Sequence, residues 1–217
     1  MMVQKQGSYE YTFSYPSIKH AERRLHFSGK EILHLVVAVL LVVSVGLSLV
    51  GVQNLFYSDF PMLALLVAMF TVSFLGHEIA HKAVAQRYGL RAEFRLTLMG
   101  AALTLLSVVS PYIKIIGPGA VMVAGSVDRD TMGKTSIAGP TINIILATIF
   151  SAATLLPQYR GIFAIIAFYN SWIAIFNLIP LGILDGFKVF TWKKGIWTLA
   201  FATSVALGVL SYERLPM

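Results

Sequence analysis

The 217-residue chain contains no cysteine and has few charged side chains. Without cysteine it can form neither a disulfide nor a metal site with thiolate ligands. Charged residues make up only 12% of the chain, against about 25% in an average soluble domain. Hydrophobic residues make up 57%, against about 45–50%. This composition argues against a soluble enzyme. It also excludes a disordered or nucleic-acid-binding protein, so we expect no nucleic acid among its partners.

The sequence instead contains long apolar runs. Four of them could cross about 30 Å of hydrocarbon as helices, and a fifth is shorter. In chain order the runs cover residues 31–52, 61–86, 137–156, 162–183 and 195–211. Before the first run, Ser28 and Glu31 have the spacing of a capping box, which marks a helix start. We therefore predict an all-α polytopic membrane protein with about five to six transmembrane helices in a lipid bilayer.

The segment from residue 97 to 123 does not fit a spanning helix. Leu96–Val109 is apolar but falls short of the roughly 20 residues that a span needs. Gly117-Pro118-Gly119 then breaks any helix, and the β-branched residues around it favour a strand. We predict a small membrane-associated re-entrant region of strand and loop, buried against the rest of the protein.

The distribution of basic residues favours five spans over six. The chain has 17 Lys and Arg residues against 10 Asp and Glu. With five spans and a cytoplasmic N-terminus, 15 of the 17 lie inside and only Arg160 and Arg214 lie outside, which agrees with the positive-inside rule. A sixth span over the ambiguous segment would put Lys188, Lys193 and Lys194 outside. The positive excess thus indicates orientation and not a binding surface.

One motif inside the second apolar run carries metal chemistry. His77-Glu78-x-x-His81 places two histidines one turn apart on the same face of a helix. Their imidazoles can bind one metal ion while Glu78 reaches a water on that metal. In a soluble helix these side chains could simply pair with neighbours. In a membrane helix ionisable groups are costly and by default functional, so we predict a zinc-dependent centre.

A hydrolytic zinc needs a third protein ligand, which must be His, Asp or Glu in a chain without cysteine. Asp185, at the end of the fourth run, is one candidate, because Pro180 would open that helix locally. Taken alone, Asp185-Gly186 reads better as a turn that ends a helix. The five-span topology favours the ligand role, since it brings His77 and Asp185 to the same cytoplasmic side. His34, one turn into the first run, is the competing ligand.

The third run begins with Gly139-Pro140-x-x-Asn143, in which the proline suits a first helical turn. Asn143 has two readings that the residues leave open. It either bonds a neighbouring helix, or it faces the site and donates to the substrate carbonyl as that oxygen becomes negative.

These motifs together resemble the site-2 protease family of intramembrane zinc metalloproteases. Its three motifs occur in order as His77-Glu78-x-x-His81, Gly139-Pro140-x-x-Asn143 and Asn177-x-x-Pro180-x-x-x-x-Asp185-Gly186. The resemblance implies that one zinc ion is bound by His77, His81 and Asp185. It makes Glu78 the catalytic base and gives the two asparagines supporting roles near the substrate.

The resemblance implies a zinc metalloendopeptidase that hydrolyses a peptide bond within or near a transmembrane segment of a membrane-protein substrate, as in regulated intramembrane proteolysis. We expect residues 1–30 to form a cytoplasmic segment and residues 31–217 one transmembrane protease domain, with its core at 61–187. The protein would be a multi-pass protein of the cell membrane, with its N-terminus and active site toward the cytoplasm. A membrane metal transporter and a catalytically inactive membrane scaffold are the alternatives.

Two hypotheses concern strands. The segment around Ile113–Val121 could offer an edge on which an extended substrate pairs. The N-terminal aromatic residues Tyr9, Tyr11, Phe13 and Tyr15 alternate with other residues at the period of a strand. They either pair with the same sheet or form an aromatic belt at the membrane surface.

Overall fold

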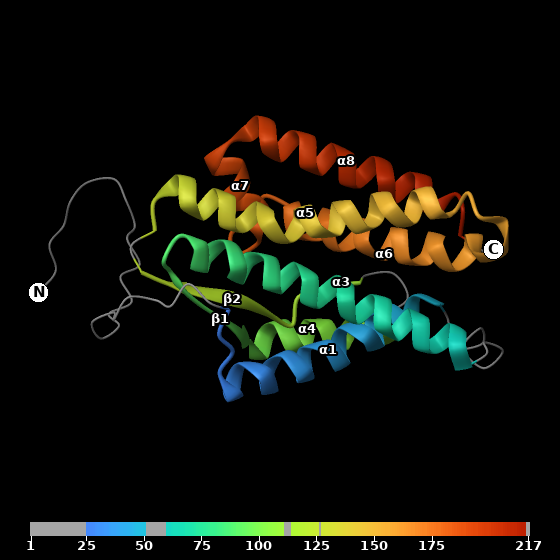
Figure 1. Ribbon diagram of the computed structural model, residues 1–217, viewed down its shortest axis with the longest axis horizontal. Helices are drawn as coiled ribbons and strands as arrows, with labels where there is room; N and C mark the ends of the chain where they lie inside the picture. The colour runs from blue at the N-terminus through green and yellow to red at the C-terminus, as the bar shows by residue number, and fades with distance from the viewer. Residues whose placement is uncertain (1–24, 51–59, 111–113, 126, 216–217) are drawn as a thin grey trace, which may run out of the picture.

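A computed structural model describes residues 25–50, 60–110, 114–125 and 127–215 of the chain (Figure 1). The N-terminal aromatic run lies outside these residues. In chain order the elements are α1 (Gly29–Val50), α3 (Phe60–Arg87), β1 (Arg91–Leu96), α4 (Leu98–Val109), β2 (Gly119–Ala124), α5 (Arg129–Ala153), η1 (Pro157–Tyr159), α6 (Arg160–Leu178), α7 (Asp185–Trp192) and α8 (Lys194–Tyr212).

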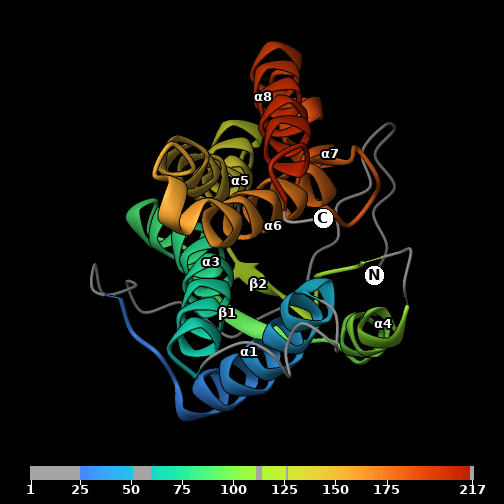
Figure 2. The ribbon, with the colours of Figure 1, turned by 90° about the vertical axis from the view of Figure 1, so that its right-hand side faces the viewer.

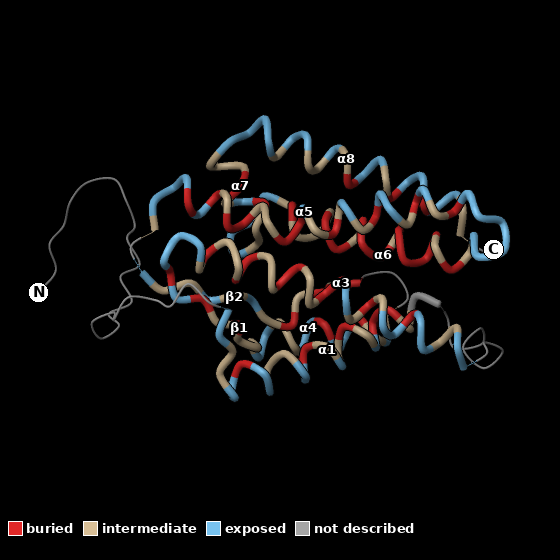
Figure 3. The backbone as a smooth tube through the Cα atoms, viewed as in Figure 1, coloured by how far each residue is buried: buried red, intermediate tan, exposed pale blue. Residues whose placement is uncertain are grey.

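Five helices within the described residues are long and apolar enough to cross a membrane, which confirms the predicted number. They are α1, α3, α5, η1 with α6, and α8. All five run along the long axis of the molecule, and buried residues gather on the sides of α3, α5 and α6 that face one another (Figures 1 and 3). Large apolar side chains such as Leu199 on α8, 71% exposed, cover outer faces that suit contact with lipid. The protein is therefore an all-α polytopic membrane protein with a small sheet.

The predicted re-entrant region contains an apolar helix that is too short to count among the candidate spans, and its secondary structure differs from the prediction. We predicted strand and loop over residues 97–123, whereas residues 98–109 form the helix α4. Thr97 starts this helix, because its Oγ1 accepts a hydrogen bond from the backbone N–H of Gly100 at 3.1 Å. The strand β2 begins directly after Gly117-Pro118, where the sequence pattern had indicated one.

β2 pairs antiparallel with β1, a strand that the sequence reading missed. The register runs from Arg91 opposite Ala124 to Leu96 opposite Gly119. The two strands lie between α1 and α3 (Figure 2). β1 alternates in burial at its start, because Ala92 and Phe94 are buried while the charged Arg91, Glu93 and Arg95 on either side of them are not, and this period of two is a short strand signal.

Helix α1 covers the outer edge of β1. The backbone N–H of Phe94 donates to Oε1 of Glu31 at 2.9 Å, and that of Leu96 donates to Nδ1 of His34 at 3.4 Å. Glu31 also receives the buried ammonium of Lys82, at 2.6 and 2.7 Å. Its carboxylate is thus used away from the helix start, and only the Ser28 half of the predicted capping box is present, at 3.2 Å.

Two of the predicted span boundaries are wrong, and both matter for the site. α5 begins at Arg129 and not at residue 137, because Asp128 caps it by accepting from the N–H of Thr131 at 2.8 Å. α6 ends at Leu178 and not at residue 183, since Pro180 cannot continue the helix. Pro140 therefore lies inside a helix, while Asp185 begins a new one.

Lys114 does not lie where the charge count put it. Its Nζ donates to Oγ of Ser48 at 2.7 Å and to the carbonyl oxygen of Ser107 at 2.9 Å. Ser48 is near the end of α1 that is remote from Gly29, so Lys114 lies away from the basic residues at the start of that helix. Lys114 thus lies beside the far end of α1, at the opposite end of that helix from Gly29.

Candidate metal centre

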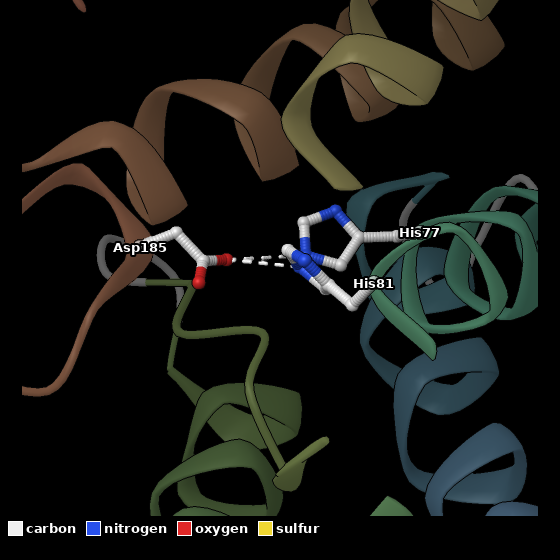
Figure 4. A group of neighbouring side chains, drawn as sticks. All are labelled: His77, His81 and Asp185. Carbon is white, nitrogen blue, oxygen red and sulfur yellow. Dashed lines mark hydrogen bonds and ion pairs between the residues drawn. The ribbon is translucent and has the colours of Figure 1, made fainter. Parts of the chain in front are cut away.

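The three side chains predicted to bind a metal lie together. His77 and His81 come from α3 and Asp185 from the start of α7, and Figure 4 shows the carboxylate pointing at both imidazoles. Oδ2 of Asp185 lies 3.7 Å from Nε2 of His77 and 3.0 Å from Nε2 of His81. The two Nε2 atoms are 3.0 Å apart. Among the described residues no second group of three or more His, Asp or Glu side chains converges in this way.

A glycine explains how the chain brings Asp185 to the histidines. After α6 ends at Leu178, residues 179–184 turn the chain back into α7. The first turn of α7 packs so closely on the end of α6 that a Cβ on Gly186 would lie 2.1 Å from the carbonyl oxygen of Leu178. Because only glycine allows this approach, Gly186 fixes the position of the neighbouring aspartate.

The donor set of the site fits a metal ion. Nδ1 of His81 lies 2.8 Å from the carbonyl oxygen of Thr135, which can only accept, so Nδ1 carries the proton and Nε2 has a free lone pair. Nδ1 of His77 faces Oδ1 of Asn143 at 2.6 Å. Two lone pairs and a carboxylate oxygen then face one another, and a cation between them removes their repulsion. Tetrahedral zinc with bonds of about 2.0–2.1 Å would separate such ligand atoms by roughly 3.3 Å.

Helix α5 passes directly over the ligand atoms, and a second glycine makes this possible. A Cβ on Gly139 would lie 2.3 Å from Nε2 of His81 and 2.7 Å from Nε2 of His77. Any larger residue would place carbon against the nitrogen lone pairs. Gly139 therefore keeps free the space in which a metal ion would bind.

Glu78 lies between the two histidines in the sequence and is 8% exposed. Its Oε2 is buried and has no hydrogen-bond partner among the described residues. An unpaired carboxylate oxygen in a buried place is costly, and such atoms call for a functional explanation. A carboxylate in this state is suited to accept a proton from a water molecule in the site.

Asn143 is fully buried and makes all its hydrogen bonds within the protein. Its Oδ1 faces His77, while its Nδ2 donates to the carbonyl oxygen of Ser73 at 3.2 Å and to Oδ1 of Asn170 at 3.0 Å. The bond to Asn170 joins α5 to α6, which is one of its two predicted roles. Both N–H groups of the amide are engaged, and a role toward a substrate carbonyl stays a prediction.

The other predicted residues, His34 and Asn177, make their hydrogen bonds elsewhere. His34 accepts from β1 as described above, so the competing third ligand is occupied at the sheet edge. Asn177 donates from Nδ2 to the carbonyl oxygen of Ile173 in its own helix, at 3.0 Å. The supporting role of Asn177 near the substrate stays a prediction.

The sequence reading missed two residues that support the site. Lys188, one turn after Asp185, approaches the second carboxylate oxygen of that residue, Oδ1, at 3.6 Å. Asn170 contacts Asn143 from the middle of α6. An amide inside an apolar run needs a partner at membrane depth, and that rule would have singled out Asn170.

Comparison with known proteins gives the family. The chain is 30% identical over 182 residues to "Putative zinc metalloprotease MJ0611" of Methanocaldococcus jannaschii, which covers 80% of this chain and 90% of that protein. The chain belongs to this family of zinc metalloproteases. It is also 30% identical over 163 residues to "Putative zinc metalloprotease YwhC" of Bacillus subtilis, which covers 61% of this chain and 70% of that protein. No protein-family model and no solved structure matches the chain.

Family and fold together describe a membrane metalloprotease. The name of the related protein indicates a zinc-dependent protease, and the five apolar helices indicate a membrane protein. Within the described residues, the group that could hold the metal is the set of His77, His81 and Asp185.

Proposed function

We propose that this metalloprotease cleaves peptide bonds within or near transmembrane segments of membrane-protein substrates, as the site-2 proteases that it resembles do. The observation that carries the proposal is the place of the site. Both histidines belong to α3, a helix apolar and long enough to span the bilayer, and both are buried among other helices. A site built there suits a substrate that reaches it through the membrane.

In this proposal His77, His81 and Asp185 hold one zinc ion. When bound, zinc lowers the pKa of a coordinated water and polarises the scissile carbonyl. Glu78 is the general base that takes the proton from the attacking water and delivers it to the leaving amine. Lys188 keeps Asp185 oriented, because its ammonium holds the carboxylate oxygen that does not face the histidines.

A helical substrate must unwind before its peptide bond can react, and the sheet offers it a place to pair. On β1 the N–H groups of Phe94 and Leu96 point to α1, so they point away from β2. Their partners across the ladder are Val121 and Gly119. In an antiparallel pair, two residues opposite one another either exchange their backbone hydrogen bonds or both point these groups outward. Because Phe94 points its N–H outward, the N–H and C=O groups of Val121 face the outer edge of β2.

The outer edges of β1 and β2 differ in whether other residues bond to their backbone groups. Glu31 and His34 satisfy the outer edge of β1, whereas among the described residues no third strand pairs with β2. Backbone groups left open at membrane depth need partners, and an extended substrate strand would provide them. This asymmetry supports β2 as the strand on which a substrate pairs.

A proline substitution tests the pairing. Val121→Pro removes one outward N–H and leaves the ladder with β1 intact, so we expect zinc content to be kept and kcat/KM to fall about tenfold. Val121→Ala, which keeps the backbone donor, is the matched control and should cleave at nearly the wild-type rate. A zinc-loaded Val121→Pro protein with wild-type kcat/KM would contradict the pairing. Ile115→Pro is less suitable, because the N–H of Ile115 already donates to Oγ of Ser107 at 2.8 Å.

The site would lie toward the cytoplasmic side of the cell membrane, with the N-terminus on the same side. The charge distribution supports this orientation, since Lys188 lies one turn after Asp185 on α7, and Lys193 and Lys194 lie where α7 ends and α8 begins. A substrate with a single span, whose cytoplasmic part is released by the cleavage, fits this arrangement and would make the reaction a step of regulated intramembrane proteolysis.

Mapping of cleavage products tests the proposed function. The purified protein in lipid vesicles is given a model single-span substrate, and mass spectrometry locates the new chain ends. We expect ends within or next to the apolar stretch, and none with Glu78→Gln, which keeps the size of the side chain but cannot act as the base. Cleavage confined to a soluble substrate would contradict intramembrane action. Zinc binding without any cleavage would favour a transporter or an inactive scaffold.

A further inference from the structure

Three of the buried polar side chains in the helices are linked to one another by hydrogen bonds. Ser73, Asn143 and Asn170 belong to α3, α5 and α6, and each is at most 1% exposed. Polar groups are expensive at this depth unless every donor and acceptor has a partner. Their hydrogen bonds form one chain that ends at His77.

Two backbone carbonyls decide which atom donates and which accepts in each of these side-chain hydrogen bonds. Nδ2 of Asn170 donates to the carbonyl oxygen of Ile166 and to Oγ of Ser73, both at 2.9 Å. Since a carbonyl oxygen can only accept, the amide of Asn170 must present its Oδ1 to Asn143. In the same way the carbonyl oxygen of Ser73 receives Nδ2 of Asn143, whose Oδ1 must then face His77.

This direction decides the tautomer of His77. Oδ1 of Asn143 is an acceptor, so Nδ1 of His77, 2.6 Å away, has to carry the proton. The lone pair of the neutral ring is then on Nε2, the atom that faces Asp185 and His81. A flipped Asn143 amide would set Oδ1 against the carbonyl of Ser73 and against Oδ1 of Asn170, which are two contacts between acceptors.

The two histidines differ in how their tautomers are set. His81 bonds to a backbone carbonyl, that of Thr135, which no side-chain substitution removes. His77 bonds to the side chain of Asn143, whose amide is oriented by the backbone carbonyl of Ser73 and by the side chain of Asn170, which in turn donates to Oγ of Ser73. Metal-bound histidines depend on such outer partners, and loss of one typically lowers metal affinity about 10- to 100-fold.

We propose that Asn170 and Ser73 are positioning residues which, through Asn143, hold His77 protonated on Nδ1 and so direct its Nε2 to the metal. Neither residue touches the metal or the substrate. The inference rests on the proposed metal site. It gives Asn143 the role of setting the tautomer of His77, with both its amide oxygen and its amide nitrogen engaged.

The first test is read on the wild-type protein, and a variant is needed only to assign one signal. Nitrogen NMR of the metal-free protein, labelled with ¹⁵N-histidine, distinguishes the two neutral tautomers by their chemical shifts. The spectrum is taken about two pH units above the ordinary histidine pKa of about 6.5. The signal of His77 is assigned by its absence from a His77→Ala sample. We expect the proton on Nδ1, and a proton on Nε2 in the wild-type protein would overturn the proposal.

The second test measures zinc affinity by competition with a chelator, which requires no protease activity. Asn170→Leu should weaken zinc binding about 10- to 100-fold, and Ser73→Ala, a smaller change, by a few-fold. The matched control is Ser171→Ala. Ser171 is the next residue of α6, equally buried, and its Oγ donates only within its own helix, to the carbonyl oxygen of Ala167 at 2.9 Å.

The results separate this inference from the proposed function. If wild type binds zinc and cleaves, while Asn170→Leu binds zinc as tightly as Ser171→Ala does, the positioning role is refuted and the protease stands. If wild type binds zinc but cleaves nothing, the function fails, and the tautomer and the affinities still test the hydrogen-bond chain. Loss of the Nδ1 signal of His77 in Asn170→Leu together with weaker zinc binding is the expected outcome.

Discussion

Replacing Gly139 with alanine should remove zinc from the protein and leave the fold intact. The added Cβ would lie 2.3 Å from Nε2 of His81, whereas real Cβ contacts are not shorter than 3.0 Å, so the ring or the helix must move by at least 0.7 Å. Metal–ligand distances are held to about 0.2 Å. A displacement several times larger disrupts coordination by a ligand, and we expect zinc affinity to fall by about 100-fold or more.

The effect of the same change on stability is much smaller. An extra methyl group in a packed interior lowers the free energy of unfolding by about 1–3 kcal/mol. Alanine in place of glycine inside a helix raises it by about 0.5–1 kcal/mol. The assay is zinc stoichiometry and chelator competition, with helix content followed by circular dichroism. Gly76→Ala is the control, because it lies next to His77 but its Cβ would meet only the side chain of Ile142, at 3.2 Å. Wild-type zinc affinity in Gly139→Ala would refute the placement of α5 over the ligands.

Glu31→Ala should destabilise the protein by about 3–5 kcal/mol, because it leaves the ammonium of Lys82 buried without its carboxylate. In unfolding measurements the double change Glu31→Leu with Lys82→Met should lose much less, and equal losses would contradict this pairing. Asp128→Ala should be less stable than wild type at neutral pH. Hydrogen bonds from the backbone N–H and then the hydroxyl of Thr131 lower the pKa of Asp128, so its stabilisation is present above the ordinary value of 3.8 and lost as the pH falls through the lowered pKa. Melting curves of the two proteins that stay apart in strong acid would argue against this. Chelation of zinc should stop cleavage, and added zinc should restore it; full activity of the metal-free protein would exclude the mechanism.

The group of residues that could hold the metal could be predicted because its members follow local rules. The spacing of His77 and His81 depends only on helix geometry. Asp185 was predicted because it follows the fourth apolar run on the same side of the membrane as the histidines, and because it belongs to a family motif. The span count followed from length and composition, which the membrane constrains strongly. These signals are all readable along a single stretch of chain.

What could not be predicted depends on contacts between distant stretches. Gly139 looked like a residue before a helix start, whereas its importance comes from histidines on another helix. The helix α4 was missed because its 12 residues are too few for a span and the Gly-Pro-Gly and β-branched residues that follow it favour a strand. Asn170 carries no motif, and its role follows only once α3, α5 and α6 are placed side by side.

Zinc X-ray absorption spectroscopy of the purified protein tests most directly the claim that His77, His81 and Asp185 hold one zinc ion. We predict one zinc per chain, with scattering from two imidazoles and with a carboxylate oxygen in a shell at about 2.0–2.1 Å. In Asp185→Ala the zinc content should fall and the remaining spectrum should change. An unchanged zinc content and spectrum in Asp185→Ala, or a zinc shell without imidazole, would contradict the assignment.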